Sequence, residues 1–350
     1  MATLWFALLC MMLIVYVVLD GFDFGAGILH VWVARSDEER RTIIAAIGPV
    51  WDGNEVWLIA AGGVLVCAFS RVYAAGFSGF YLPLMMALWL LILRGLSIEM
   101  RSHEKNFLWR SFWDGLLFFS SALMAVVLGA ALGCIIRGVP INQTGFFEGP
   151  LFTDFRVSAH PGVLDWYTVL VGLFALCTLA LHGALYLYWK TAGPVQQRCR
   201  ALAPYLWGIQ VVLGVVTTVA TNAARPDLYV HLMARPWTWI FAITILLGVV
   251  GIPLQLRRGS ELPAFLASCA VIVGLLGATA AGLYPTVLHS TISPAYDLTI
   301  YNAVNGESTL RIALFWWIPA FLLAVLYFAT IYRLFRGKAE LDPTGQSHYG

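Results

Sequence analysis

The chain has 350 residues, of which 60% are hydrophobic and 11% are charged, and its formal net charge is +2. Average soluble domains carry about 25% charged residues, so this composition excludes an ordinary soluble protein. The near-balanced charge also provides no basic face for nucleic acid. Apolar runs of about 20 residues, without the alternation of barrel strands, indicate an all-α polytopic membrane protein.

Nine apolar stretches predict about nine transmembrane helices, and the whole chain, 1–350, is expected to form a single integral membrane domain. The expected spans are roughly 4–33, 50–69, 73–95, 113–135, 162–189, 204–222, 237–256, 263–284 and 310–335.

The Lys and Arg residues are unevenly shared between the two sides of these spans. Fifteen of the 21 fall on one side, which the positive-inside rule assigns to the cytoplasm. The N-terminus is then expected outside and the C-terminus in the cytoplasm.

Two carboxylates lie inside the first apolar run, in LDGFDFGAG. Asp20 and Asp23 are three residues apart, so a helix places them near one face. Gly25 and its neighbouring glycines allow another helix to approach that face closely. Intramembrane carboxylates are costly and often serve as proton relays or ion sites. The alternative is a purely structural pair, satisfied at a tight helix crossing.

Asp52 and Glu55 repeat this spacing in GPVWDGNEVWLIAAGG, at the start of the second span. As a structural alternative, Asp52 would favour the positive end of a new helix. With the expected orientation, the four carboxylates predict a short proton inlet from the cytoplasm. Trp57 in the same motif is expected to pack or to anchor the interface rather than to bind a cofactor.

Arg94 ends the third apolar run, in LILRG. It is expected either to reach the cytoplasmic interface or to neutralise Asp52, Glu55 or Glu99.

His30 and His182 are the two histidines expected on helices, and no CxxCH haem-attachment motif is present. They give weak support for haem bound by this chain alone, and a packed or hydrogen-bonded role is favoured for each. The sequence also shows no metal-binding, Walker or dinucleotide-binding motif.

Several motifs together resemble subunit II of the cytochrome bd-type quinol oxidases. They are LDGFDFGAGIL, SDEERRTIIAAIGPVWDGNEVWLIAAGG, YAAGFSGFYLPL, LILRG and LHGALYLYWKT. The match is strongest over the first hundred residues, and the later half resembles the family mainly in its helix pattern.

The resemblance implies two four-helix bundles with a peripheral helix, in the bacterial inner membrane. It implies a terminal oxidase that oxidises quinol, reduces oxygen to water and generates proton motive force without pumping. Haems b and d are expected on subunit I, not on this chain. The other implied partners are quinol, membrane lipids and, in some members, a structural quinone and a small accessory subunit.

The resemblance also assigns roles to residues. Asp23 and Asp52 match acidic residues tied to the proton path or to haem-site integrity. Trp57 matches a tryptophan that lines an oxygen route in some members, and Arg94 matches an arginine associated with the haem region. No directly catalytic residue is expected on this chain.

Two alternatives remain beside this hypothesis. The first is a proton- or cation-coupled secondary transporter that uses Asp20, Asp23, Asp52 and Glu55, although the sequence shows no clear internal repeat. The second is a purely structural scaffold subunit in which the carboxylates serve only packing.

Overall fold

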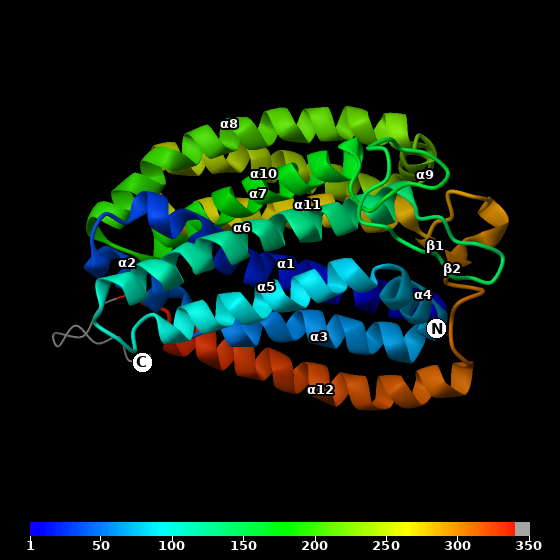
Figure 1. Ribbon diagram of the computed structural model, residues 1–350, viewed down its shortest axis with the longest axis horizontal. Helices are drawn as coiled ribbons and strands as arrows, with labels where there is room; N and C mark the ends of the chain where they lie inside the picture. The colour runs from blue at the N-terminus through cyan, green and yellow to red at the C-terminus, as the bar shows by residue number, and fades with distance from the viewer. Residues whose placement is uncertain (340–350) are drawn as a thin grey trace.

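The computed structural model describes residues 1–339, and these form long, roughly parallel helices with short elements at the two ends (Figure 1). The elements are α1 (Ala2–Val33), α2 (Asp37–Ile47), α3 (Trp51–Ala68), α4 (Ser70–Gly79), α5 (Tyr81–Met100), α6 (Phe107–Arg137), α7 (Trp166–Lys190), α8 (Gly193–Ala224), α9 (Asp227–Met233), η1 (Pro236–Thr238), α10 (Trp239–Arg258), α11 (Glu261–Leu283), β1 (Thr286–Leu288), η2 (Pro294–Tyr296), β2 (Leu298–Thr299) and α12 (Glu307–Leu334).

Within the described residues, eight helices are long and apolar enough to cross a membrane: α1, α5, α6, α7, α8, α10 with η1, α11 and α12. Helix α3 is shorter and begins with polar residues, but it packs lengthwise on α1 and returns the chain to the opposite end. It makes the ninth crossing, which confirms the expected all-α polytopic fold.

The crossings form two four-helix groups and one outlying helix. Helices α1, α3, α5 and α6 form the first bundle, and α7, α8, α10 and α11 form the second. Helix α1 lies at the centre, because it contacts α3 and α6 in its own bundle and α7 and α11 in the other. Helix α12 packs mainly along α3 at the edge of the molecule.

Glycines bring α1 and α7 together where the two bundles meet. A Cβ atom on Gly25 would lie 2.1 Å from the Leu179 carbonyl oxygen and 2.6 Å from Gly183 Cα. A side chain at either glycine would force the helices apart, so the predicted role of the glycines after Asp23 is confirmed for Gly25.

Three expected span boundaries were wrong. The span expected at 73–95 is interrupted at Phe80, where α4 ends and α5 begins, and Pro83 in the first turn of α5 supplies no N–H for a bond back toward α4. Helix α6 starts at Phe107, not at 113, because the Asn106 side chain caps it. Helix α8 continues through Pro204, the expected start, back to Gly193.

The two ends of the molecule differ in character. The end that carries α2, at the left of Figure 1, holds a network of ion pairs among α1, α2, α5 and α6. The end that carries α9 holds the longer connections, 138–165 and 284–306, with the short β1–β2 pair. We refer to these as the α2 end and the α9 end.

Candidate functional site

Arg94, on α5, lies at the centre of a buried charge cluster. It is 0% exposed, and it donates to Asp20 Oδ1 at 2.5 Å and to Glu55 Oε2 at 3.0 Å. Its guanidinium also stacks on the Phe24 ring, 4.1 Å from the centroid. Of the two interpretations of Arg94, neutralisation of Glu55 is therefore confirmed, and an interfacial position is wrong. The arginine therefore links α5 to α1 and α3 within the first bundle.

Asp23 lies beside this cluster, but no cation among residues 1–339 is at hydrogen-bond distance from it. Its Oδ2 accepts from Asn54 Nδ2 at 2.7 Å, while its Oδ1 has no hydrogen-bond partner among residues 1–339. The Asn54 amide nitrogen also donates to the Leu19 carbonyl at 3.3 Å. Tyr332 of α12 donates to Asn54 Oδ1 at 3.0 Å. A single neutral donor therefore supports this buried carboxyl.

Asp52 lies outside the buried cluster. It is exposed in the first turn of α3, where a carboxylate is also favourable for the helix dipole. Glu55 lies one turn deeper, with its side chain 19% exposed, while Asp20 and Asp23 are fully buried. The structure thus arranges the four predicted carboxylates in order of burial, from Asp52 at the surface to the two on α1.

Trp57 is buried in an aromatic contact between α3 and α12. Its ring centroid lies 6.0 Å from that of Phe321 and 5.5 Å from that of Phe328. The expected packing role of this tryptophan is confirmed. Its indole Nε1 has no hydrogen-bond partner within the described part of the chain.

The two helix histidines are occupied by contacts within the chain. His30 Nδ1 bonds to the Gly27 carbonyl at 2.7 Å, and its Nε2 lies 3.3 Å from Asp114 Oδ1. His182 Nε2 bonds to the Val18 carbonyl at 2.9 Å, and its Nδ1 to Ser268 Oγ at 2.7 Å. Both nitrogens of His182 are hydrogen-bonded, and His30 Nε2, which has no hydrogen-bond partner among residues 1–339, is fully buried against the Asp114 carboxylate. Neither ring is therefore open to a haem iron.

A second charge cluster closes the α2 end of the first bundle. Asp114 of α6 binds Arg101 at 2.6 Å and Arg40 at 2.7 Å, and Arg101 also binds Asp37 at 2.9 Å. Asp114 lies in the second turn of a longer helix and is almost fully buried. Because these charges satisfy one another between α2, α5 and α6, the cluster has a structural role.

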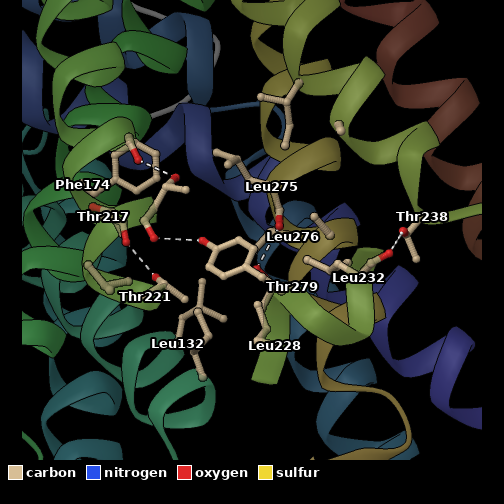
Figure 2. A pocket seen from close by; sticks show the side chains of 18 of the residues that line it. Leu132, Phe174, Thr217, Thr221, Leu228, Leu232, Thr238, Leu275, Leu276 and Thr279 are labelled. Atoms are coloured by element: carbon tan, nitrogen blue, oxygen red, sulfur yellow. Dashed lines mark hydrogen bonds between the residues drawn. The ribbon is translucent and has the colours of Figure 1, made fainter. Parts of the chain in front are cut away.

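The second bundle, together with α6 and α9, lines a partly open cavity of about 330 Å³ toward the α9 end (Figure 2). Side chains from α6, α7, α8, α9, α10 and α11 line it, and most of them are apolar. Several hydroxyls also face the cavity, and most of these donate to backbone carbonyls, as Tyr229 does to Thr218 at 3.1 Å. The Thr217 hydroxyl is different, because it is buried with no hydrogen-bond partner among residues 1–339. The cavity therefore offers one available hydroxyl donor.

A family model described as cytochrome bd terminal oxidase subunit II matches residues 1–335. The chain belongs to this family. Cytochrome bd ubiquinol oxidase subunit 2 of Bacillus subtilis is 31% identical to it over 312 residues, which cover 88% of each protein. Cytochrome bd-I ubiquinol oxidase subunit 2 of Escherichia coli is 30% identical over 353 residues, which cover 93% of this chain and 91% of the relative.

A solved structure of bd oxidase from Geobacillus thermodenitrificans shows the same fold. The match has a TM-score of 0.75 at 20% sequence identity and covers 95% of this chain and 98% of that one. The chain is thus subunit II of a cytochrome bd-type terminal oxidase, a haem-containing membrane complex in which it works beside a subunit I. This membership does not favour the transporter alternative.

Three residues of the site were missed as contributors from the sequence. Asn54 lies inside the WDGNEVW motif, and its position on the helix face toward α1 was a usable signal. Tyr16, four residues before Asp20, is buried beside it on α1. Tyr332 joins from α12, and nothing in its local sequence indicates a contact with Asn54, 278 residues away.

Proposed function

We propose that this bd oxidase subunit conducts protons from the cytoplasm toward the haem-bearing subunit I, where quinol is oxidised and oxygen is reduced to water. In this proposal haems b and d belong to subunit I, and the complex lies in the bacterial inner membrane. The α2 end then faces the cytoplasm and the N-terminus lies outside. A small accessory subunit and membrane lipids complete the proposed partners.

The ordered burial of the four carboxylates is the observation that supports this function best. Asp52 is exposed at the α2 end, Glu55 is partly exposed one turn deeper, and Asp20 is fully buried. A proton inlet needs acidic groups in such a series, from the surface to the buried end of the path.

Arg94 explains how the series tolerates like charges. It pairs with Asp20 and Glu55 at once, so these two can approach without facing each other uncompensated. Asp23 lies beyond reach of a direct bond from this cation, and burial of an isolated carboxylate is very costly. In the resting state we therefore place a proton on Asp23, from which it can be passed on.

The test is to replace Asp52 with Asn and, separately, Glu55 with Gln. Each change removes a proton-carrying group while keeping the size of the side chain. The rate of oxygen consumption with quinol as electron donor should therefore fall about 10-fold or more, while the haem absorbance stays unchanged. Glu307→Gln, at an exposed acid paired with Arg311 on α12, is the matched control and should leave turnover at the wild-type rate. Wild-type turnover in both path variants would refute the inlet.

We propose that subunit I docks on the face formed by α3, α5 and α12. The exposed stripe of α3 consists of Asp52, Val56, Ile59, Gly63 and Val66. It presents apolar and small side chains directly beside the Glu55–Arg94 pair. Small residues favour close helix approach in membranes. A partner on this face would receive protons from the carboxylate series.

We further propose that the cavity of the second bundle holds the structural quinone found in some members of the family. Its lining is largely apolar, as an isoprenoid chain requires, and the Thr217 hydroxyl is available to donate to a ring carbonyl. The purified Thr217→Val complex should contain less than half as much extractable quinone as the wild-type complex. The Thr218 hydroxyl already donates to the Gly214 carbonyl, so the Thr218→Val complex should retain its quinone. Equal quinone content in both variants would refute this occupant.

A further inference from the structure

Tyr332 reaches the acidic cluster from α12, the least buried of the candidate membrane helices among residues 1–339. The most apolar stretch of α12 has no buried residue, and the helix packs mainly along α3. Near the α2 end, however, the Tyr332 hydroxyl donates to Asn54 Oδ1 at 3.0 Å. This contact links the outlying helix to the buried carboxyl of Asp23.

The contact fixes the orientation of the Asn54 side chain. An amide has two N–H donors and one carbonyl acceptor. Here the nitrogen donates to Asp23 and to the Leu19 carbonyl, and the oxygen accepts from Tyr332. A rotated amide would lose the bond to Leu19 and would turn its oxygen toward the Asp23 carboxyl. The tyrosine hydroxyl therefore keeps a donor, not an acceptor, on Asp23.

Asp23 depends on this donor because its other neighbours do not bind it directly. Arg94 donates its hydrogen bonds to Asp20 and Glu55, and Asp23 Oδ1 has no partner among residues 1–339. The titratable and charged groups that face Asp23 come from five helices: Asp20 of α1, Glu55 of α3, Arg94 of α5, Tyr186 of α7 and Tyr332 of α12.

We propose that Tyr332 is a positioning residue for proton transfer at Asp23, and that it acts through Asn54. When Asp23 releases its proton toward subunit I, the recipient in the proposed path, the carboxylate left behind keeps the Asn54 N–H bond, and Tyr332 retains its own proton throughout. The hydroxyl thus lowers the cost of the deprotonated state without entering the path. This inference rests on the proton path proposed above.

The experiment compares Tyr332→Phe with the wild-type complex across a range of pH. The ring that packs near Phe328 is kept, and only the hydroxyl is lost. Without it Asn54 is free to rotate, so proton release becomes harder. Turnover at neutral pH should fall about five-fold, with KM for quinol and the haem spectrum unchanged. The low-pH limb of the turnover profile should move up by about half to one pH unit.

The matched control is Tyr205→Phe, at an exposed tyrosine on α8 outside the proposed docking face, which should leave both turnover and pH profile unchanged. A Tyr332→Phe complex with a wild-type pH profile would overturn the inference, whether or not its turnover falls. A shift of the same size in Tyr205→Phe would also overturn the inference.

Asn54→Leu tests whether Tyr332 acts through Asn54. Its own pH profile can be measured even if the Tyr332→Phe complex does not assemble. It removes the donor from Asp23, so its pH profile should shift at least as far as that of Tyr332→Phe. The double variant should shift no further than Asn54→Leu. Additive shifts, or a wild-type profile in Asn54→Leu, would contradict action through Asn54.

Asp23→Asn separates this inference from the function on which it rests. Wild-type turnover in Asp23→Asn would sink the role of Asp23 in the proton path itself. Slow turnover in Asp23→Asn with an unshifted profile in Tyr332→Phe would sink only the role of Tyr332.

Discussion

At the scale of single residues, the electrostatics of the site depend on one cation. Arg94 is fully buried and bonds to two carboxylates from different helices. Its partner Asp20 is also fully buried, whereas Glu55 is partly exposed. Loss of the arginine would therefore strand a charge at Asp20, while Glu55 retains access to solvent.

We predict that Arg94→Met destabilises the subunit by about 3–5 kcal/mol, because it leaves the Asp20 carboxylate without its cation. The double variant Arg94→Met with Asp20→Leu should recover much of this loss, since an apolar pair of similar volume avoids the unpaired charge. The measurement is the amount of assembled, haem-containing complex and its melting temperature in detergent. A double variant as unstable as the single one would contradict this account.

Glu39 of α2 gives a prediction about pH at the same scale. Hydrogen bonds from the Arg198 guanidinium, at 2.7 and 3.1 Å, lower the pKa of Glu39 from 4.5 to about 2. A lowered pKa means that the ion pair stabilises the folded state fully above pH 4.5 and that this stabilisation is lost as the pH falls toward 2.

The melting temperature of the wild type should therefore exceed that of Glu39→Gln at pH 6, and the difference should shrink below pH 4.5. The pair is partly exposed and solvent screens it, so the difference should be small. A difference that grows on acidification would show that the sign is wrong.

At the scale of elements, the contact between α1 and α7 joins the two bundles. Gly25 and Gly183 face each other there, and each would place a Cβ atom within 2.6 Å of the opposite backbone. This crossing holds α1 in the centre of the molecule, so it also sets the position of Asp20 and Asp23 relative to α3 and α5.

We predict that Gly25→Ala lowers the melting temperature of the complex and its haem content, because overpacking a tight contact costs about 1–3 kcal/mol. Gly208→Ala in α8 is the control, since a Cβ atom there meets nothing within 4 Å. Alanine is the better helix former, so the control should be neutral or slightly stabilising. Equal behaviour of the two variants would argue against the crossing as a constraint.

At the scale of the whole molecule, the acidic cluster extends from the central helix α1 to the outer face of α3. Its partly exposed member, Glu55, opens on the face of α3, which α5 and α12 flank (Figure 1). The proposed docking of subunit I on this face would place the haem-bearing partner next to the carboxylate series.

We predict that Gly63→Trp, in the exposed stripe of α3, reduces copurification of subunit I more than 10-fold while the subunit itself still inserts in the membrane. An indole at this position would hold the partner away from α3. Val212→Trp on the exposed surface of α8 is the control and should retain the partner. Full copurification with Gly63→Trp would place the interface elsewhere.

Much of the fold could be predicted from the sequence, because each helix that crosses a membrane requires a long apolar run. The nine crossings and the close helix approach at the α1 glycines could both be predicted this way. Helix boundaries were less predictable near prolines, because a proline can lie either in the first turn of a helix or in its interior. Pro83 lies in the first turn of α5, whereas Pro204 lies inside α8.

The pairing of charges was decided by the tertiary structure alone. Local sequence shows that Arg94 needs a carboxylate, but not that Asp20 is that partner, since they are 74 residues apart and meet only when α1 and α5 pack. The same holds for Tyr332 and Asn54, and for the cavity lined by six helices. The sequence by itself determined which residues leave water, because transfer into a membrane depends on local composition. Which of them meet was decided by packing, because contacts between distant helices depend on the shape of the whole chain.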